Sequence, residues 1–148
     1  MSYFPLRTFP DAAQQANLWV CELADHLDCE QREAYEVLRT VLHALRDSMT
    51  VYDISEFANY LPVLLRGIFY ENWHPIAASA ARYDIEHISA AVGARLDCDE
   101  AESRRAIAEV FKILELRANP VITEKLRALP RAALSPSLST RGTQSGQR

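Results

Sequence analysis

Apolar residues recur every three or four positions along most of this chain, the spacing of one buried face of an α-helix. The first stripe consists of Ala12, Ala16, Trp19, Leu23 and Leu27. Asp11 stands directly before this stripe and after Pro10, so we expect it to be the N-cap of the first helix.

A second stripe appears twice, and both copies follow an aspartate. The first copy contains Leu38, Val41, Leu42 and Leu45, and the second contains Ile107, Val110, Phe111 and Leu114. The offset is 69 positions throughout, as it is from Asp28 to Asp97, and we expect each of these aspartates to cap the helix after it. One offset shared by so many positions predicts a duplicated helical unit, whose two copies pack around a common core.

Two shorter helices are predicted between these copies. Thr50, with Asp53 three residues later, is typical of an N-cap and predicts a helix that ends near Leu61. Pro62 suits the first turn of a helix, so we expect a further helix over residues 62–72.

The whole pattern predicts an all-α fold. We expect a single helical-bundle domain of about seven helices made of two pseudo-repeats. The domain spans residues 1–134, with repeat one at 11–74 and repeat two at 80–134, and residues 135–148 form a disordered tail because they are polar and nearly without apolar residues.

The composition is typical of a globular protein and argues against nucleic acid and membranes as partners. The chain has 49% hydrophobic and 24% charged residues, as an ordinary globular protein does, and its net charge is −4. An acidic chain neutralises phosphates poorly, and no run approaches the roughly 20 apolar residues of a membrane span, so we expect neither nucleic acid nor membrane as a partner. The three cysteines form no CxxC pair, which together with the lack of a secretory signal favours a cytoplasmic protein.

Two segments carry a resemblance to a known family. They are Leu38-Arg39-Thr40-Val41-Leu42-His43-Ala44-Leu45-Arg46-Asp47 and Leu61-Pro62-Val63-Leu64-Leu65-Arg66-Gly67-Ile68-Phe69-Tyr70-Glu71-Asn72-Trp73. In this order they resemble the bacterial family called domain of unknown function 2267, over about residues 10–130. The resemblance implies a helical fold of two similar halves in a small soluble protein, and it implies no activity, cofactor or catalytic residue.

The predicted helix over 62–72 and its end supply the candidate partner-binding group. It consists of Arg66, Phe69, Tyr70, Trp73 and His74. Arginine beside amphipathic aromatic residues is typical of binding hot spots, so we expect a protein partner or a second copy here. The alternative is structural, with Phe69 and Trp73 in the core and Arg66 pairing with Glu71 or capping a carbonyl.

Cys29 and Cys98 occupy equivalent positions in the two copies, which we expect to be the first positions of helices. A helix N-terminus can lower the pKa of a thiol, whereas the neighbouring acidic residues oppose this. We favour a small residue that fits both turns, with redox chemistry as the alternative.

Motifs for metal binding and catalysis are weak. Glu22 with His26 and Asp84 with His87 have helical spacing, but neither makes the Glu-x-x-His motif of a bundle metal site. No nucleophile, phosphate-loop or dinucleotide fingerprint occurs. We therefore expect no metal, no cofactor and no catalytic residue, and we lean away from an enzyme.

Two functions from different classes remain open. The first is a non-enzymatic interaction or scaffolding module that self-associates or binds a protein through the helix at 62–74. The alternative is a protein that binds a small apolar ligand in the groove between the two halves, because the interiors of helix bundles host such sites.

Overall fold

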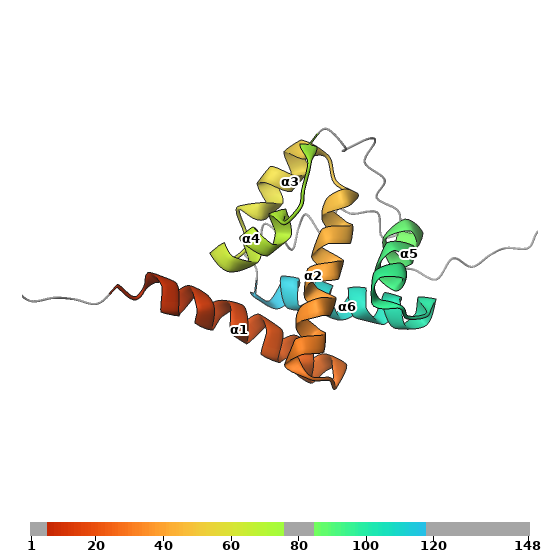
Figure 1. The fold of residues 1–148 in the computed structure, drawn as a ribbon, viewed down its shortest axis with the longest axis horizontal. Coiled ribbons are helices and arrows are strands. Elements are labelled where there is room, and N and C mark those ends of the chain that lie inside the picture. The colour runs from red at the N-terminus through yellow and green to blue at the C-terminus, as the bar shows by residue number, and fades with distance from the viewer. Residues whose placement is uncertain (1–5, 76–84, 118–148) are drawn as a thin grey trace, which may run out of the picture.

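The computed structural model describes residues 6–75 and 85–117, and this part is all-helical. The helices are α1 (Thr8–Leu27), α2 (Gln31–Asp47), α3 (Val51–Ala58), α4 (Val63–Tyr70), α5 (Ile85–Leu96) and α6 (Glu100–Arg117). The predicted all-α class is confirmed (Figure 1). The predicted later helices and the tail lie outside the described residues, as does the N-terminal segment over residues 1–5.

Helix α2 is the centre of the packing. It contacts α1, α4, α5 and α6, and Figure 1 shows it between the α3–α4 pair on one side and α5 on the other. Every residue from Thr40 to Arg46 is buried, so this end of the helix has no solvent face. A helix buried on all sides must be covered by several neighbours, and its polar residues must find partners inside the protein.

The core positions predicted for the duplicated stripe are buried with one exception. Leu38, Val41, Leu42 and Leu45 are all enclosed, as are Ile107, Val110 and Leu114 of the second copy. Phe111 is only partly buried, and Ile113 is fully enclosed instead. The buried face of α6 therefore turns away from the predicted register, because α6 packs against α1 and α5 as well as α2.

The predicted start of α1 is wrong by one turn. The helix begins at Thr8 with Arg7 as N-cap, and Asp11 lies inside it. Pro10 does not delay the start, because the first N–H groups of a helix have no intrahelical acceptor and a proline there loses no bond. Thr50 is the N-cap of α3 as predicted, since its Oγ1 accepts the Asp53 N–H at 3.2 Å.

Asp28 and Asp97 do not cap the helices that follow them. Each has a φ of 52°, in the left-handed region, and Asp28 terminates α1. The N–H of Cys29 donates to Ala24 O, and the N–H of Asp28 donates to Asp25 O. This is the hydrogen-bond pattern of a Schellman C-cap, in which a left-handed residue closes the last turn.

The N-caps of α2 and α6 lie two residues further along than predicted. Glu30 occupies the N-cap of α2 without a side-chain hydrogen bond. At α6 the Glu102 N–H donates to Asp99 Oδ1 at 2.8 Å, and the Asp99 N–H donates to Glu102 Oε2 at 3.1 Å. These reciprocal bonds form a capping box, which satisfies two N–H groups at the helix start.

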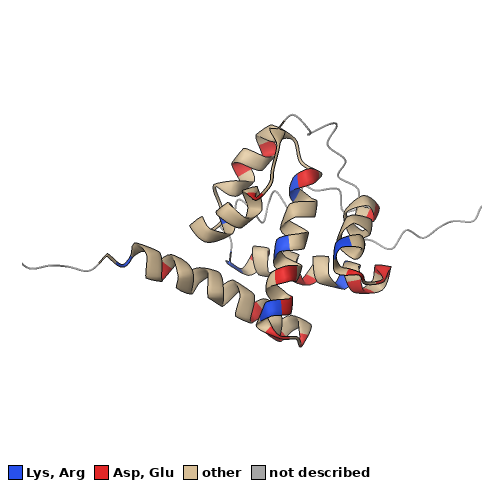
Figure 2. Cartoon of the chain, in the orientation of Figure 1, with Lys and Arg blue, Asp and Glu red and all other residues tan. Residues whose placement is uncertain are grey.

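The backbone of the two turns is alike. The Cys98 N–H donates to Gly93 O at 3.1 Å, as the Cys29 N–H does to Ala24 O at the same distance. Figure 2 shows acidic residues, in red, at both turns. The likeness covers these turns, and duplication of the whole unit stays a prediction. No helix among the described residues combines the length and apolar character needed to cross a bilayer.

Candidate functional site

Two residues of the predicted partner-binding group have structural contacts. Phe69 is 0% exposed, and its ring lies 5.3 Å from that of Phe57 on α3. Arg66 donates from Nε to Ala58 O at 2.9 Å and from Nη2 to Leu61 O at 3.3 Å. Arg66 therefore connects α4 to carbonyl groups at the end of α3 and in the turn after it.

The other three residues of the group lie at the end of α4, where Tyr70 is its last residue, and directly after it. Tyr70 and Trp73 are half-buried with ring centroids 5.6 Å apart, and His74 is exposed. Asn72 between them has a φ of 57°, so the chain turns sharply directly after the helix. This turn separates Trp73 and His74 from the body of α4, and both line a cavity.

This cavity, which we name the α2–α5 cavity, has a volume of about 570 Å³. Its lining comes from α2 and the residues directly after it, from the segment over 71–74, from Ile54 on α3 and from Arg95 on α5. The lining residues are Arg39, Thr40, His43, Arg46, Asp47, Met49, Ile54, Glu71, Asn72, Trp73, His74 and Arg95. Arg95 belongs to the second predicted half, so the cavity lies where the two halves meet.

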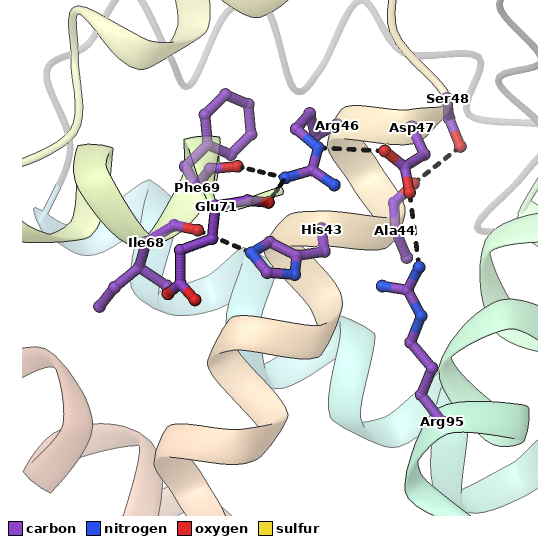
Figure 3. Close-up of polar contacts among 9 residues, drawn as sticks. All are labelled: His43, Ala44, Arg46, Asp47, Ser48, Ile68, Phe69, Glu71 and Arg95. Carbon is purple, nitrogen blue, oxygen red and sulfur yellow. Dashed lines mark hydrogen bonds and ion pairs between the residues drawn. The ribbon is translucent and has the colours of Figure 1, made fainter. Parts of the chain in front are cut away.

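The floor of the cavity is a set of hydrogen bonds from α2 to the end of α4 (Figure 3). Arg46, only 4% exposed, donates from Nη1 to Phe69 O at 2.8 Å and to Glu71 O at 2.7 Å. His43 Nε2 lies 2.6 Å from Ile68 O, and because a carbonyl can only accept, this nitrogen carries the proton. The cation and the ring N–H thus satisfy carbonyls at the negative end of α4.

Three ion pairs line the cavity. Arg39 Nη2 lies 3.1 Å from Glu71 Oε2, and this hydrogen bond raises the pKa of Arg39. Arg95 Nη2 lies 3.5 Å from Asp47 Oδ2. The other carboxylate oxygen of Asp47, Oδ1, accepts a hydrogen bond from Arg46 Nε at 3.0 Å. Asp47 therefore connects a buried arginine of α2 to an exposed arginine of α5.

Burial determines the charge of His43. Loss of solvent lowers its pKa, and the nearby cations of Arg46 and Arg39 add to this, while the Ile68 carbonyl opposes it. His43 is therefore neutral at pH 7 and acts as a hydrogen-bond donor. The proton on its ring is directed to Ile68 O, and this hydrogen bond fixes the orientation of the ring.

The cysteines and the histidine pairs do not extend this site. Cys29 and Cys98 precede their helices instead of opening them, and burial, followed by the charges of neighbouring acidic residues, raises the pKa of both thiols. Glu22 pairs with Arg117, and His26 Nδ1 lies 3.2 Å from Glu109 Oε2. Asp84 lies outside the described residues, which contain no group of three possible metal ligands.

The sequence pattern did not mark Arg39, His43, Arg46 or Arg95 as site residues. The available signal was three polar residues at a spacing of three or four, at 39, 43 and 46, on a helix that is otherwise strongly apolar at its C-terminal end. Such a row on a buried helix requires partners on a neighbouring element.

Comparison with known proteins identifies a family. The family model for an uncharacterized conserved protein, DUF2267, matches residues 16–133. None of the curated proteins compared with the chain matches it significantly.

Proposed function

The chain belongs to the DUF2267 family, and from its geometry we propose that it is a non-enzymatic binding module that holds its ligand or partner in the α2–α5 cavity. One observation carries the proposal. Trp73 and His74, from the predicted partner-binding group, line the same cavity as Arg95, from the second predicted half. The predicted partner-binding group and the predicted groove between the halves therefore both point to the α2–α5 cavity as the binding site.

The contacts of the lining favour binding over catalysis. Asp47 and Glu71 are both engaged by arginines, and the N–H of His43 is engaged by a carbonyl. A general base needs a free lone pair within hydrogen-bond reach of the proton it removes, and the arginines already bind the carboxylates of Asp47 and Glu71. The lining is also charged, which favours a polar ligand over the apolar ligand that a bundle interior suggests.

A pair of truncation variants tests the proposal. Trp73→Ala removes the aromatic wall of the cavity, whereas Phe9→Ala removes a 73% exposed ring at the start of α1, outside the cavity lining. We expect native mass spectrometry of the purified protein to show a bound compound, or a partner that also binds after reconstitution from purified components. Binding should survive Phe9→Ala and be lost in Trp73→Ala.

Two results would contradict the proposal. One is a native spectrum that shows the bare chain alone, with no partner recovered by reconstitution. The other is a ligand or partner that Trp73→Ala retains as well as the parent does, because the binding surface would then lie elsewhere on the protein.

Self-association through the helix at 62–74 is the second candidate function. Val63 and Leu64 at the start of α4 are 58% and 44% exposed, which is unusual for two adjacent large apolar side chains. We expect light scattering to show a mass that rises with concentration, and Val63→Glu with Leu64→Glu to abolish the rise. Val51→Glu, at a similarly exposed position on α3, is the control. A constant monomer mass would eliminate this candidate.

A further inference from the structure

We infer that the α2–α5 cavity binds an organic anion, with a carboxylate or phosphate group held by Arg46 and Arg95 and an apolar part against Trp73. The inference rests on the proposed function and names the class of ligand. It follows from the net charge of the lining, from the hydrogen-bond donors of the two arginines and from the apolar residues that also line the cavity.

The lining is positively charged in a negatively charged protein. Arg39, Arg46 and Arg95 face two carboxylates, Asp47 and Glu71, which leaves one uncompensated positive charge, whereas the whole chain has a net charge of −4. A concave site with low-dielectric walls concentrates the field of its own charges, so the local excess governs which ion enters. An anion is favoured here although the molecule as a whole repels it.

Arg46 has one donor group to spare. Its Nε and Nη1 are committed to Asp47, Phe69 O and Glu71 O. Its Nη2 has no hydrogen-bond partner among the described residues and is not fully enclosed. Figure 3 shows this nitrogen pointing away from the α4 carbonyls. A buried guanidinium held by three bonds presents its remaining N–H groups in a fixed direction, which lowers the entropic cost of binding an oxyanion.

Arg95 supplies the second group that binds the anion, because its ion pair with Asp47 is weak. The Arg95–Asp47 contact is 3.5 Å long, and both side chains are 46% exposed. An exposed pair at this distance contributes little to stability, so Arg95 can exchange Asp47 for a ligand oxygen at small cost. Arg39 is less available, since its bond to Glu71 is shorter. Two guanidinium groups from different helices suit the oxygens of a carboxylate or phosphate.

The apolar residues of the lining disfavour a bare inorganic ion as the best ligand. Trp73, Met49 and Ile54 also line the cavity, and none of them offers a charge. A volume of about 570 Å³ greatly exceeds that of a phosphate ion and falls in the usual range for sites that bind small organic molecules. An anion with a flat apolar portion would use both walls, with the ring against Trp73 and the charge at the arginines.

The test uses Trp73 as its own reporter. The chain has two tryptophans, and Trp19 is buried in the core. Trp19→Phe therefore leaves Trp73 as the sole tryptophan, and the fluorescence of Trp73 reports on the cavity. The probes are phenyl phosphate, benzoate, inorganic phosphate and the cation benzylammonium. We expect a saturable change with phenyl phosphate or benzoate, a weaker response to inorganic phosphate and none to benzylammonium. The first two probes also distinguish a phosphate site from a carboxylate site.

Three variants assign the response to named residues. Arg95→Gln should weaken binding about tenfold or more, because it removes a charge-assisted hydrogen bond. Arg104→Gln, at a half-buried arginine of α6 that pairs with Glu100 and lies outside the cavity lining, should leave binding unchanged. Asp47→Asn should tighten binding, because it removes the carboxylate that competes with the ligand for both arginines.

The inference is overturned if none of the anions gives a saturable response, if benzylammonium binds equally well, or if Arg104→Gln weakens binding as much as Arg95→Gln. Its failure is distinguishable from failure of the proposed function. If Trp73→Ala abolishes binding of a ligand or partner and Arg95→Gln does not affect it, the proposed binding function is supported and only the inference of an anionic ligand is rejected.

Discussion

At the scale of single residues, Arg46 and His43 show how a buried helix accommodates polar side chains. Both lie on the part of α2 where every residue from Thr40 to Arg46 is enclosed. Their donors go to Ile68 O, Phe69 O and Glu71 O, which lie at the end of α4 and directly after it. The side chains of α2 therefore donate to carbonyl groups around the end of α4. The cost of burying the charge of Arg46 is offset by its three hydrogen bonds, to Phe69 O, Glu71 O and Asp47 Oδ1.

Arg46→Met should destabilise the fold. The variant keeps much of the buried volume but leaves the carbonyls of Phe69 and Glu71 without donors, at a cost of about 2–4 kcal/mol. Urea unfolding monitored by circular dichroism measures the free energy of unfolding. Arg104→Met, at a half-buried arginine of α6, is the matched control and should change it by less than about 0.5 kcal/mol. Equal effects of the two substitutions would show that the α2–α4 bonds add no stability.

His43 should make stability depend on pH in a particular direction. Its pKa is lowered in the folded protein, chiefly by burial, and is close to 6.5 in the unfolded chain. Below about pH 6.5 the unfolded chain therefore takes up a proton more readily than the folded protein, so this contribution to stability is complete above that pH and lost as the pH falls.

Comparison of variants isolates the effect of His43. The free energy of unfolding should drop more between pH 7.5 and pH 5.5 in the parent protein than in His43→Gln, which keeps an N–H donor and cannot titrate. His74→Gln removes an exposed histidine and should retain the parent's pH dependence. An identical pH dependence in the parent and His43→Gln would contradict a lowered pKa.

At the scale of elements, the turns between helices are set by residues with left-handed backbone. Asp28 and Asp97 share a φ of 52°, and the hydrogen bond that closes the preceding helix has the same length in both turns. Aspartate tolerates this conformation better than most residues, although glycine is the usual choice. The aspartates were expected to begin helices, and instead Asp28 ends one.

Asp28→Gly should therefore stabilise the protein by about 0.5–1 kcal/mol, since glycine adopts the left-handed region without the steric cost of a Cβ. Asp28→Val should destabilise it by about 1–2 kcal/mol, because a β-branched residue is strained at that φ. Thermal unfolding of the two variants provides the comparison. If Asp28 were an N-cap, glycine would stabilise nothing and both substitutions would weaken the fold.

At the scale of the whole molecule, one helix connects elements that are distant in sequence. Helix α2 contacts α1 and α4 of the first predicted half and α5 and α6 of the second. Neither half can bury its apolar stripes without this helix, so the described part should unfold as one cooperative unit.

Leu42→Asp tests that cooperativity. Leu42 is fully enclosed, and an unpaired carboxylate there should exceed the stability of the protein and unfold both halves together. Phe111→Asp, at the equivalent but only partly buried position, should lower the melting temperature and leave the protein folded. Calorimetry of the parent should show a single transition, and two separated transitions would show that the halves are independent.

The sequence alone determined the helical class, most core positions and the cap at Thr50, because apolar periodicity and capping are local properties. It predicted a partner-binding segment that contains Trp73 and His74, but it did not show that they share a cavity with Arg46 and Arg95.

Only the tertiary structure decided the contacts of that cavity. The bonds of Arg46 to Phe69 O and Glu71 O and of Arg95 to Asp47 span 23 to 48 residues of sequence, and they exist because α4 and α5 both pack beside the end of α2. No repeating pattern within one helix specifies which polar groups a neighbouring helix will bring to it, and the cavity depends on that choice.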